Sequence, residues 1–172
     1  ALPEPPIGTD SEHCGNVVPE ASVASGGVNG SGTFNWYDAV SGGNLLQSSS
    51  STTFTSPVNT STTFYVSEVG ANGCESERTP VNVTVIEADP ISIAATDTEI
   101  CIGQSTDLTV SQTGGNNTYT LSWSASPAGS GVDGSETGSF LTVTPTQSGV
   151  FTYVVTGEDV DKGCITNANI EV

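Results

Sequence analysis

Apolar and polar residues alternate in several short stretches, and this two-residue period predicts β-strands. In residues 33–36, Phe34 and Trp36 alternate with Thr33 and Asn35, and three valines alternate with polar residues in 81–85. Residues 121–123 and 141–144 repeat the pattern. Successive side chains of a strand point to opposite faces, so each stretch has one core-facing side. No stretch has the 3.6-residue apolar period of an amphipathic helix, and we predict an all-β fold.

Clusters of Gly, Pro, Ser and Asn separate these stretches. Ser41–Asn44, for example, is a turn sequence that leads into Leu45 and Leu46. Gly, Pro, Asn and Ser each favour turn conformations, and strands that are bounded by turn signals every 8–12 residues are typical of β-sandwiches. We therefore predict sandwich architecture.

Several landmark residues recur in one order, which indicates an internal duplication. Each copy contains a Cys, a Trp 22 positions later, a Pro, a Tyr eight positions after that Pro, and a closing Gly-Cys pair. The landmarks are Cys14, Trp36, Pro57, Tyr65 and Gly73-Cys74 in the first copy, and Cys101, Trp123, Pro145, Tyr153 and Gly163-Cys164 in the second. The sequence predicts two immunoglobulin-like modules, residues 1–88 and 89–172.

The stretch between the copies, Ile86–Pro90, is a short linker. Pro90 restricts Asp89 to an extended conformation, so we expect a joint with limited freedom. The Pro-rich opening of the chain is typical of an interdomain linker. We expect the chain to be a fragment of a longer secreted protein.

Four cysteines in an acidic, Ser- and Thr-rich chain suggest disulfides formed in an oxidising compartment. Of the three pairings that four cysteines allow, the duplication favours one bridge in each module, Cys14–Cys74 and Cys101–Cys164. Each would close a loop of about 60 residues and stabilise its module by roughly 4 kcal/mol. As core anchors we predict Trp36, Trp123, Tyr65 and Tyr153.

The net charge of −17 comes from 19 acidic residues against only two basic ones. A surface this negative repels phosphate backbones and anionic lipids, so we expect no nucleic-acid partner. No window supplies the roughly 20 apolar residues of a membrane span, and we expect no membrane insertion. The charge favours a soluble, monomeric protein. The cysteines, which suggest an oxidising compartment, favour an extracellular or cell-surface location.

Residues 14–85 resemble a known family of Ig-like modules, those called CHU_C-associated. The resemblance is carried by Trp36–Ala39, Ser41–Gly43 with Leu45-Leu46, Phe54–Pro57, Thr62–Val66 and Gly73–Val81. Residues 98–172 resemble the PKD-like and Ig-like repeats of the same proteins through Cys101–Ser105, Val143–Pro145, Phe151–Val155 and Gly163-Cys164.

The resemblance implies a large secreted or cell-surface protein of Bacteroidetes-type bacteria, in which such modules act as spacers or adhesive repeats. The 22-residue offset from Cys to Trp is longer than in the antibody pattern, and it suggests that each first Cys precedes the second strand of its sandwich and each second Cys lies in the turn before the last strand. On this basis we expect the disulfides at one end of each sandwich.

Catalytic residues are scarce. His13 is the only histidine, and the adjacent Ser11 and Glu12 have poor geometry for a triad. We interpret His13 as an exposed loop residue. Paired carboxylates would need a cleft that narrow sandwiches rarely provide. We predict that the chain is not an enzyme and needs no cofactor.

Two acidic segments are candidates for calcium binding. Glu158, Asp159 and Asp161 lie in one loop that partly resembles the start of an EF-hand loop. Glu87 and Asp89 lie in the linker, where a shared cation would stiffen the joint. The alternative is that these acids form solvated turns.

One aromatic residue is a candidate for sugar binding. A planar ring can stack on the apolar face of a pyranose, and Tyr37 points away from Trp36 in the predicted strand. Asn35 and Asp38 lie beside Tyr37 in the sequence, and the three residues could form a small glycan patch.

The sequence as a whole favours a non-catalytic structural or adhesive pair of modules that spaces or presents other domains. Its expected partners are neighbouring modules of the same polypeptide. The alternatives are a carbohydrate-binding module for a neutral polysaccharide, and a calcium-rigidified adhesin segment that contacts a surface protein.

Overall fold

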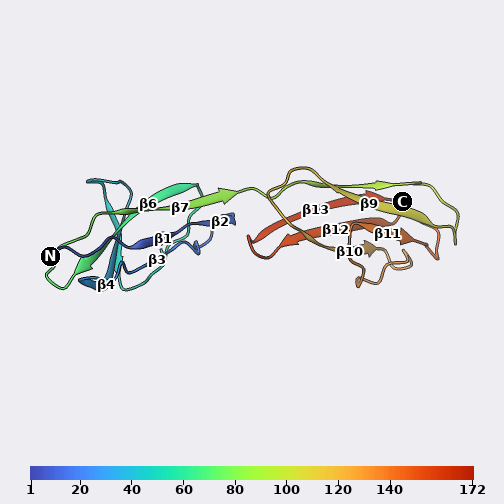
Figure 1. Ribbon diagram of the computed structural model, residues 1–172. Coiled ribbons are helices and arrows are strands. Elements are labelled where there is room, and N and C mark those ends of the chain that lie inside the picture. The colour runs from blue at the N-terminus through green and yellow to red at the C-terminus, as the bar shows by residue number, and fades with distance from the viewer. The chain divides into compact units, whose positions relative to one another are not determined.

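The computed structural model describes residues 1–172 and contains thirteen strands and no helix (Figure 1). The chain divides into two compact units, Ala1–Ile86 and Glu87–Val172, which we call unit 1 and unit 2. No element is a helix long and apolar enough to cross a membrane. The predicted all-β class with immunoglobulin-like sandwiches is confirmed.

Unit 1 consists of a five-stranded and a two-stranded sheet. The large sheet has the order β2-β7-β6-β4-β5, and the small one pairs β1 with β3. The strands are β1 (Ile7–Thr9), β2 (Ser11–Cys14), β3 (Ser22–Ala24), β4 (Gly30–Tyr37), β5 (Leu45–Ser49), β6 (Thr62–Gly70) and β7 (Thr79–Ile86). All pairs are antiparallel except β2 with β7, which run parallel.

Unit 2 consists of two three-stranded antiparallel sheets, β10-β12-β13 and β11-β9-β8. Its strands are β8 (Ile91–Ala95), β9 (Thr106–Gln112), β10 (Thr120–Ser126), β11 (Phe140–Val143), β12 (Thr152–Asp159) and β13 (Cys164–Glu171).

Three aromatic rings form the centre of the core of unit 1. Trp36 is fully buried and lies 5.7 Å from both Phe54 and Phe64, measured between ring centroids. The Phe54 and Phe64 rings are 4.3 Å apart. Aliphatic side chains of the facing strands complete the cluster, including Val23, Val58, Val66, Val81 and Val83.

The core of unit 2 is built around Trp123 and Tyr153, and both polar groups of these rings have partners. Trp123 Nε1 donates to the Gly138 carbonyl at 2.8 Å, and the Tyr153 hydroxyl donates to the Ser130 carbonyl at 2.7 Å. Because an unpaired buried polar group is costly, these bonds let two large amphipathic rings pack inside a small module. Leu108, Val143, Val155 and other apolar side chains surround them.

The strand registers correct one of the four predicted core anchors. Trp36 is opposite Val66, and Trp123 is opposite Val155. Two positions before each valine stand Phe64 and Tyr153, so Tyr153 corresponds to Phe64 and not to Tyr65. Tyr65 lies on the other face of β6 and is half-buried. The Pro-to-Tyr spacing is equal in the two copies, but the core-facing aromatic residue lies one position earlier in unit 1, at Phe64.

The predicted disulfide of the first module is wrong. Cys74 is free and exposed, whereas Cys14 is disulfide-bonded. Cys14 ends β2, which runs parallel to β7 and places Cys14 opposite Ile86 at the end of β7. Cys74 precedes the start of β7, and an eight-residue strand is about 25 Å long. Disulfides need Cα atoms within about 7 Å, so the two cysteines lie too far apart to be bonded.

The predicted disulfide of the second module is wrong for the same reason. Cys101 is free and exposed, and Cys164 is disulfide-bonded. Cys101 and Val172 line one cavity, so Cys101 lies near the C-terminal end of β13. Cys164 is the first residue of β13. Neither unit therefore holds the bridge expected for it.

Phe64→Ala should destabilise unit 1 far more than Tyr65→Ala. Removing the Phe64 ring leaves a cavity beside Trp36 and should cost about 3–5 kcal/mol, whereas a half-buried Tyr65 should cost about 1 kcal/mol. Urea unfolding followed by tryptophan fluorescence measures both losses. Equal losses, or a larger loss for Tyr65→Ala, would place Tyr65 in the core after all.

The native protein should carry two thiols that react with a maleimide without reduction, Cys74 and Cys101, because both are exposed. Peptide mass spectrometry after labelling identifies the modified positions, and Cys14 and Cys164 should stay unlabelled. Absence of labelling at Cys74 and Cys101 would show that these thiols are not free and would contradict the expectation.

Candidate functional site

A carboxylate on the outer face of the large sheet of unit 1 accepts hydrogen bonds from two neighbouring strands. Glu75 accepts hydrogen bonds from Asn35 Nδ2 at 2.9 Å, from the Tyr37 hydroxyl at 2.9 and 3.0 Å, and from Ser67 Oγ at 2.5 Å. These donors lie on β4 and β6 and face away from the core. Glu75 lies in the turn between β6 and β7, so one side chain covers both neighbouring strands.

The guanidinium of Arg78 covers the ring of Tyr37. Arg78 Cζ lies 3.3 Å from the ring centroid, and Nη1 donates to the carbonyls of Ala39 at 2.6 Å and Gly42 at 2.8 Å. A cation over an aromatic face is attracted by the ring quadrupole. This face of Tyr37, which sugar stacking would need, is therefore occupied within the protein.

Two of the three residues predicted as a glycan patch share Glu75 as a hydrogen-bond partner, and the third, Asp38, has a different one. Asn35 and Tyr37 are both buried and bonded to Glu75. Asp38 is exposed and accepts from Asn44 N and Nδ2, both at 2.7 Å, which closes the turn before β5.

The Glu75 network also sets the ionisation of its members. Burial opposes the charge on Glu75, but hydrogen bonds from Ser67, Tyr37 and Asn35 outweigh it and hold the pKa of Glu75 below its ordinary value. Burial and the neighbouring Glu75 raise the pKa of Tyr37. Glu75 is therefore a charged acceptor at neutral pH and Tyr37 a neutral donor.

A second carboxylate lies inside unit 1. Glu68 is fully buried and accepts from Ser25 Oγ at 2.8 Å, Gly26 N at 3.2 Å and Gly32 N at 3.1 Å. A Cβ at Gly30, the first residue of β4, would collide with this carboxylate, which favours glycine at that position. Sequence reasoning missed Glu68, although its two-residue spacing from Val66 places both on the core face.

In unit 2 the structure brings together two acids from the separate calcium candidates. Asp89 and Asp159 are both buried, and Asn117 lies between them. The amide of Asn117 accepts from Asp89 N at 2.8 Å through Oδ1 and contacts Asp159 Oδ2 at 3.4 Å through Nδ2. We call Asp89, Asn117 and Asp159 the carboxamide bridge.

The carboxylate oxygens of the bridge are already used as acceptors. Asp89 Oδ2 accepts from Gln112 Nε2 at 2.9 Å, Asn116 N at 2.8 Å and Asn117 N at 3.1 Å. A side chain at Gly114, whose φ is +114°, would collide with the same carboxylate. Asp89 therefore shapes the β9–β10 loop around itself.

Asp159 holds two segments by the same means. Its Oδ2 accepts from Thr118 N at 3.0 Å, and its Oδ1 accepts from Lys162 N at 3.3 Å. Lys162 Nζ in turn donates to the Asn116 carbonyl. The acidic loop and the β9–β10 loop are thereby joined.

The other predicted calcium ligands lie outside the bridge. Glu158 and Asp161 are exposed, and so is Glu87. No group of three or more His, Cys, Asp or Glu side chains is placed to hold a metal ion. Sequence reasoning missed Gln112, Asn116 and Asn117; the Gly-Gly-Asn-Asn run at 114–117 was the available signal for a special loop.

The interpretation of His13 as an exposed loop residue is wrong. His13 lies in β2, is 7% exposed, and its Nε2 lies 3.0 Å from the Val58 carbonyl. Because the partner is a carbonyl, Nε2 carries the proton and donates. His13 thus fastens β2 to the segment before β6.

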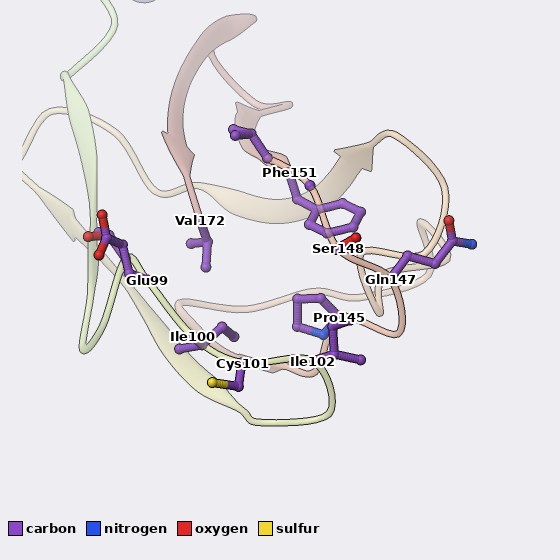
Figure 2. Close-up of a pocket in the computed structure, with 12 residues that line it drawn as sticks. Glu99, Ile100, Cys101, Ile102, Pro145, Gln147, Ser148, Phe151 and Val172 are labelled. Carbon is purple, nitrogen blue, oxygen red and sulfur yellow. The ribbon is translucent and has the colours of Figure 1, made fainter.

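A cavity of about 280 Å³ opens at the end of unit 2 where β13 finishes. Figure 2 shows Phe151 and Val172 above it and the Ile100–Ile102 segment with Pro145 below. Phe151 is buried, whereas Ile102 and Val150 are exposed. The cavity is mainly apolar and includes the free thiol Cys101 on its wall.

Unit 2 should lose stability in acid because of the carboxamide bridge. Burial opposes the charge on Asp89, but the bonds from Gln112, Asn117 and Asn116 outweigh it and lower its pKa. The Thr118 amide is the main cause of the lowered pKa of Asp159. Carboxyls with a depressed folded pKa stabilise above the unfolded value of about 3.9, and this contribution disappears as pH falls through the folded value.

Melting curves between pH 7 and pH 2 test this expectation. The melting temperature of unit 2 should fall below about pH 4, near the unfolded pKa. Asp89→Asn and Asp159→Asn should lower it already at pH 7 and flatten its decline in acid. Asp161→Asn, which removes one exposed charge from the same loop, is the matched control and should leave the curve unchanged. Identical curves for Asp89→Asn and Asp161→Asn would refute a stabilising bridge.

Comparison with solved structures gives distant similarity over nearly the whole chain. The fibronectin(III)-like modules of Clostridium thermocellum CbhA align with 95% of this chain and 90% of their own at 13% identity and a TM-score of 0.44. Three N-terminal domains of the bacteriophage RB49 outer capsid protein Hoc align with 99% of this chain and 58% of theirs at 16% identity and a TM-score of 0.46. No curated protein matches the chain.

A family model gives the assignment for unit 1. The model described as "Ig-like domain CHU_C associated" matches residues 3–86. Ig-like domains typically occur in extracellular or surface proteins and are generally non-catalytic. The residues that carried the resemblance in the sequence, from Trp36 to Val81, all lie within this match. Unit 1 belongs to the CHU_C-associated family of Ig-like domains.

Proposed function

We propose that the chain is a non-catalytic structural module pair that spaces or presents other domains of a secreted or surface protein. Its partners in this role are neighbouring modules of the same polypeptide. Ig-like modules have a structural or adhesive character, and the proposal adds the specific role and the extracellular setting to it.

The observation that carries the proposal is that the hydrogen-bonded carboxylates of both units bind segments of their own unit. Glu68, Glu75, Asp89 and Asp159 all accept several N–H or O–H groups of their own unit. A ligand site needs polar groups whose bonding capacity is free to meet the ligand. Here that capacity fastens the loops that join the strands, which suits a module whose task is to keep its shape.

The net charge supports the same role. With −17 charges on 172 residues, copies of the chain repel one another, and the chain stays soluble without a partner. Strong negative charge also disfavours binding to nucleic acid and acidic surfaces. The proposed protein is an extracellular monomer without a resident cofactor.

A carbohydrate-binding role is the alternative to be tested first. Its best candidate, Tyr37, would have to release Arg78 from one ring face before a sugar could stack there. A calcium-stiffened adhesin is the other alternative, and calcium would have to displace amide donors from Asp89 or Asp159. Both require existing contacts to break, which favours the spacer.

Co-sedimentation with insoluble cellulose, chitin and plant glycans should leave the protein in solution, with and without millimolar calcium. The melting temperature should be the same in calcium and in a chelator, because a cation bound only by the native state would raise it. A known cellulose-binding module in the same tubes controls for binding capacity.

Two outcomes would contradict the spacer. Depletion on one neutral glycan that is lost in Tyr37→Ala but kept in Tyr65→Ala would establish a carbohydrate-binding module. A calcium-dependent rise in melting temperature that disappears in Asp159→Asn would establish the calcium-rigidified segment.

A further inference from the structure

The chain contains two Asn-Gly sequences, and the fold of unit 1 brings them together. Asn29-Gly30 leads into β4, and Asn72-Gly73 lies in the turn after β6. Both asparagines are exposed, and both line one hollow of about 180 Å³ beside Ala1. The two sequences therefore share one end of the unit and one solvent environment.

An Asn-Gly sequence can modify itself, because glycine has no side chain to hinder its own nitrogen. The main-chain nitrogen of the glycine loses its proton and attacks Cγ of the asparagine, the Cγ–Nδ2 bond breaks, and ammonia leaves. Water then opens the five-membered succinimide at either carbonyl. The products are aspartate, or isoaspartate, in which the side-chain carbons have become part of the main chain. The reaction needs a free glycine nitrogen and a carboxamide that can swing toward it.

The turn after β6 holds both reacting groups of Asn72-Gly73. Gly73 N donates to the Gly70 carbonyl at 2.9 Å, which engages the nitrogen that would attack. Asn72 Oδ1 accepts from Cys74 N at 3.1 Å, and Nδ2 donates to the Ala1 carbonyl at 3.2 Å. Cyclisation at Asn72 would have to break all three bonds.

The attacking nitrogen of the other sequence is not bonded to its neighbouring strand. Gly30 in β4 faces Gly70 in β6. Gly70 N donates to the Cys74 carbonyl at 2.8 Å, and the Gly70 carbonyl accepts from Gly73 N, so both groups point to the turn. The N–H and C=O of one strand residue point to the same side, and the two facing glycines therefore form a non-hydrogen-bonded pair.

The carboxamide of Asn29 is held by one long contact. Its Nδ2 lies 3.5 Å from the Leu2 carbonyl, beyond the ordinary length of an N–H···O bond. The side chain is exposed and can rotate toward Gly30 N with little loss. Asn29-Gly30 thus meets both conditions that Asn72-Gly73 fails.

Modification at Asn29 would disturb a tightly packed contact. A Cβ on Gly30 would collide with the carboxylate of Glu68, so the Gly30 backbone lies directly against this buried group. Isoaspartate adds one carbon to the main chain immediately before Gly30. The added length has to move Gly30 or Glu68, and Glu68 accepts bonds from Ser25 Oγ at 2.8 Å and Gly26 N at 3.2 Å.

The loop that would move also holds the first residues of the described chain. Glu4 N donates to the Val28 carbonyl at 3.2 Å. A Cβ on Gly26 would collide with the Pro5 carbonyl and with Glu4, so residues 4–5 lie directly on this loop. A carboxylate at position 29 would in addition face the Leu2 carbonyl with no proton to donate.

We propose that Asn29-Gly30 is a self-modification site, at which the native chain converts to aspartate and isoaspartate with water as the only co-reactant. The conversion releases residues 1–5 from the loop before β4 and adds one negative charge. Asn72-Gly73 stays intact in the native fold, because its turn holds both reacting groups.

Incubation of the native protein at mildly alkaline pH, below its melting temperature, tests the site. Peptide mass spectrometry with fragmentation separates asparagine from its two acidic products at positions 29 and 72. Asn29 should convert several-fold faster than Asn72 in the native protein. In urea, which removes the turn, the two rates should become similar.

Two results would overturn the assignment of the site. Equal rates at the two positions in the native protein would show that the fold does not distinguish them. An intact Asn29 in the native protein, when both positions convert in urea, would show that the fold protects this sequence as well.

Amide hydrogen exchange at Glu4, followed by NMR, tests the release. Exchange should become faster in the converted protein, isolated by anion exchange, and in Asn29→Asp, which carries the aspartate form from the start. Asn59→Asp is the matched control, because Asn59 is exposed in another loop of unit 1 and gains the same charge. Its exchange at Glu4 should equal that of the unmodified protein. Unchanged exchange in the converted protein, or an equal rise in Asn59→Asp, would refute the release.

Discussion

In each unit, the register between the Trp-bearing strand and one neighbour determines which side chains of these strands face the core. The pairs are β4 with β6 in unit 1 and β10 with β12 in unit 2. In unit 1, the alignment of Trp36 with Val66 places both side chains in the core. Because side chains alternate, Glu68 must also point inward and Ser67 outward. A slip of one residue would expose Trp36 and turn all the remaining side chains of the strand to the opposite face of the sheet. The inward position of the Glu68 carboxylate follows from this register.

The acidity of the chain has a structural part as well as a surface part. Several of its 19 acids, Glu68, Glu75, Asp89 and Asp159 among them, accept hydrogen bonds from loop backbone or from side chains of neighbouring strands. Bonds to ionised acceptors are about twice as strong as neutral ones. A module of about 85 residues has a small core, so the hydrogen bonds of these carboxylates are important for holding its loops in one conformation. Solubility alone, as predicted from composition, does not account for them.

The fold class could be predicted from the sequence because alternation and turn residues are local signals. Trp36 and Trp123 stand in such alternating stretches and are buried, and Tyr153, which was identified by its spacing from Pro145, is buried as well. Tyr65 failed because Phe64 precedes it directly, and spacing alone cannot choose between adjacent aromatics. The carboxamide bridge could not be predicted, because Asp89 and Asp159 are 70 positions apart and meet only through the fold.

The predicted disulfides inside each module were wrong, and in unit 1 the reason is the direction of β2, which runs parallel to β7. Duplicated cysteines suggested a bridge inside each module, and this would require both cysteines at the same end of the sandwich. The parallel pairing of β2 with β7 instead places Cys14 at the end of β7 and leaves Cys74 near its start. Cys14 and Cys74 are therefore too far apart to bond to each other. The internal stability of each sandwich comes from its aromatic core and its bonded carboxylates, and not from a disulfide inside the unit.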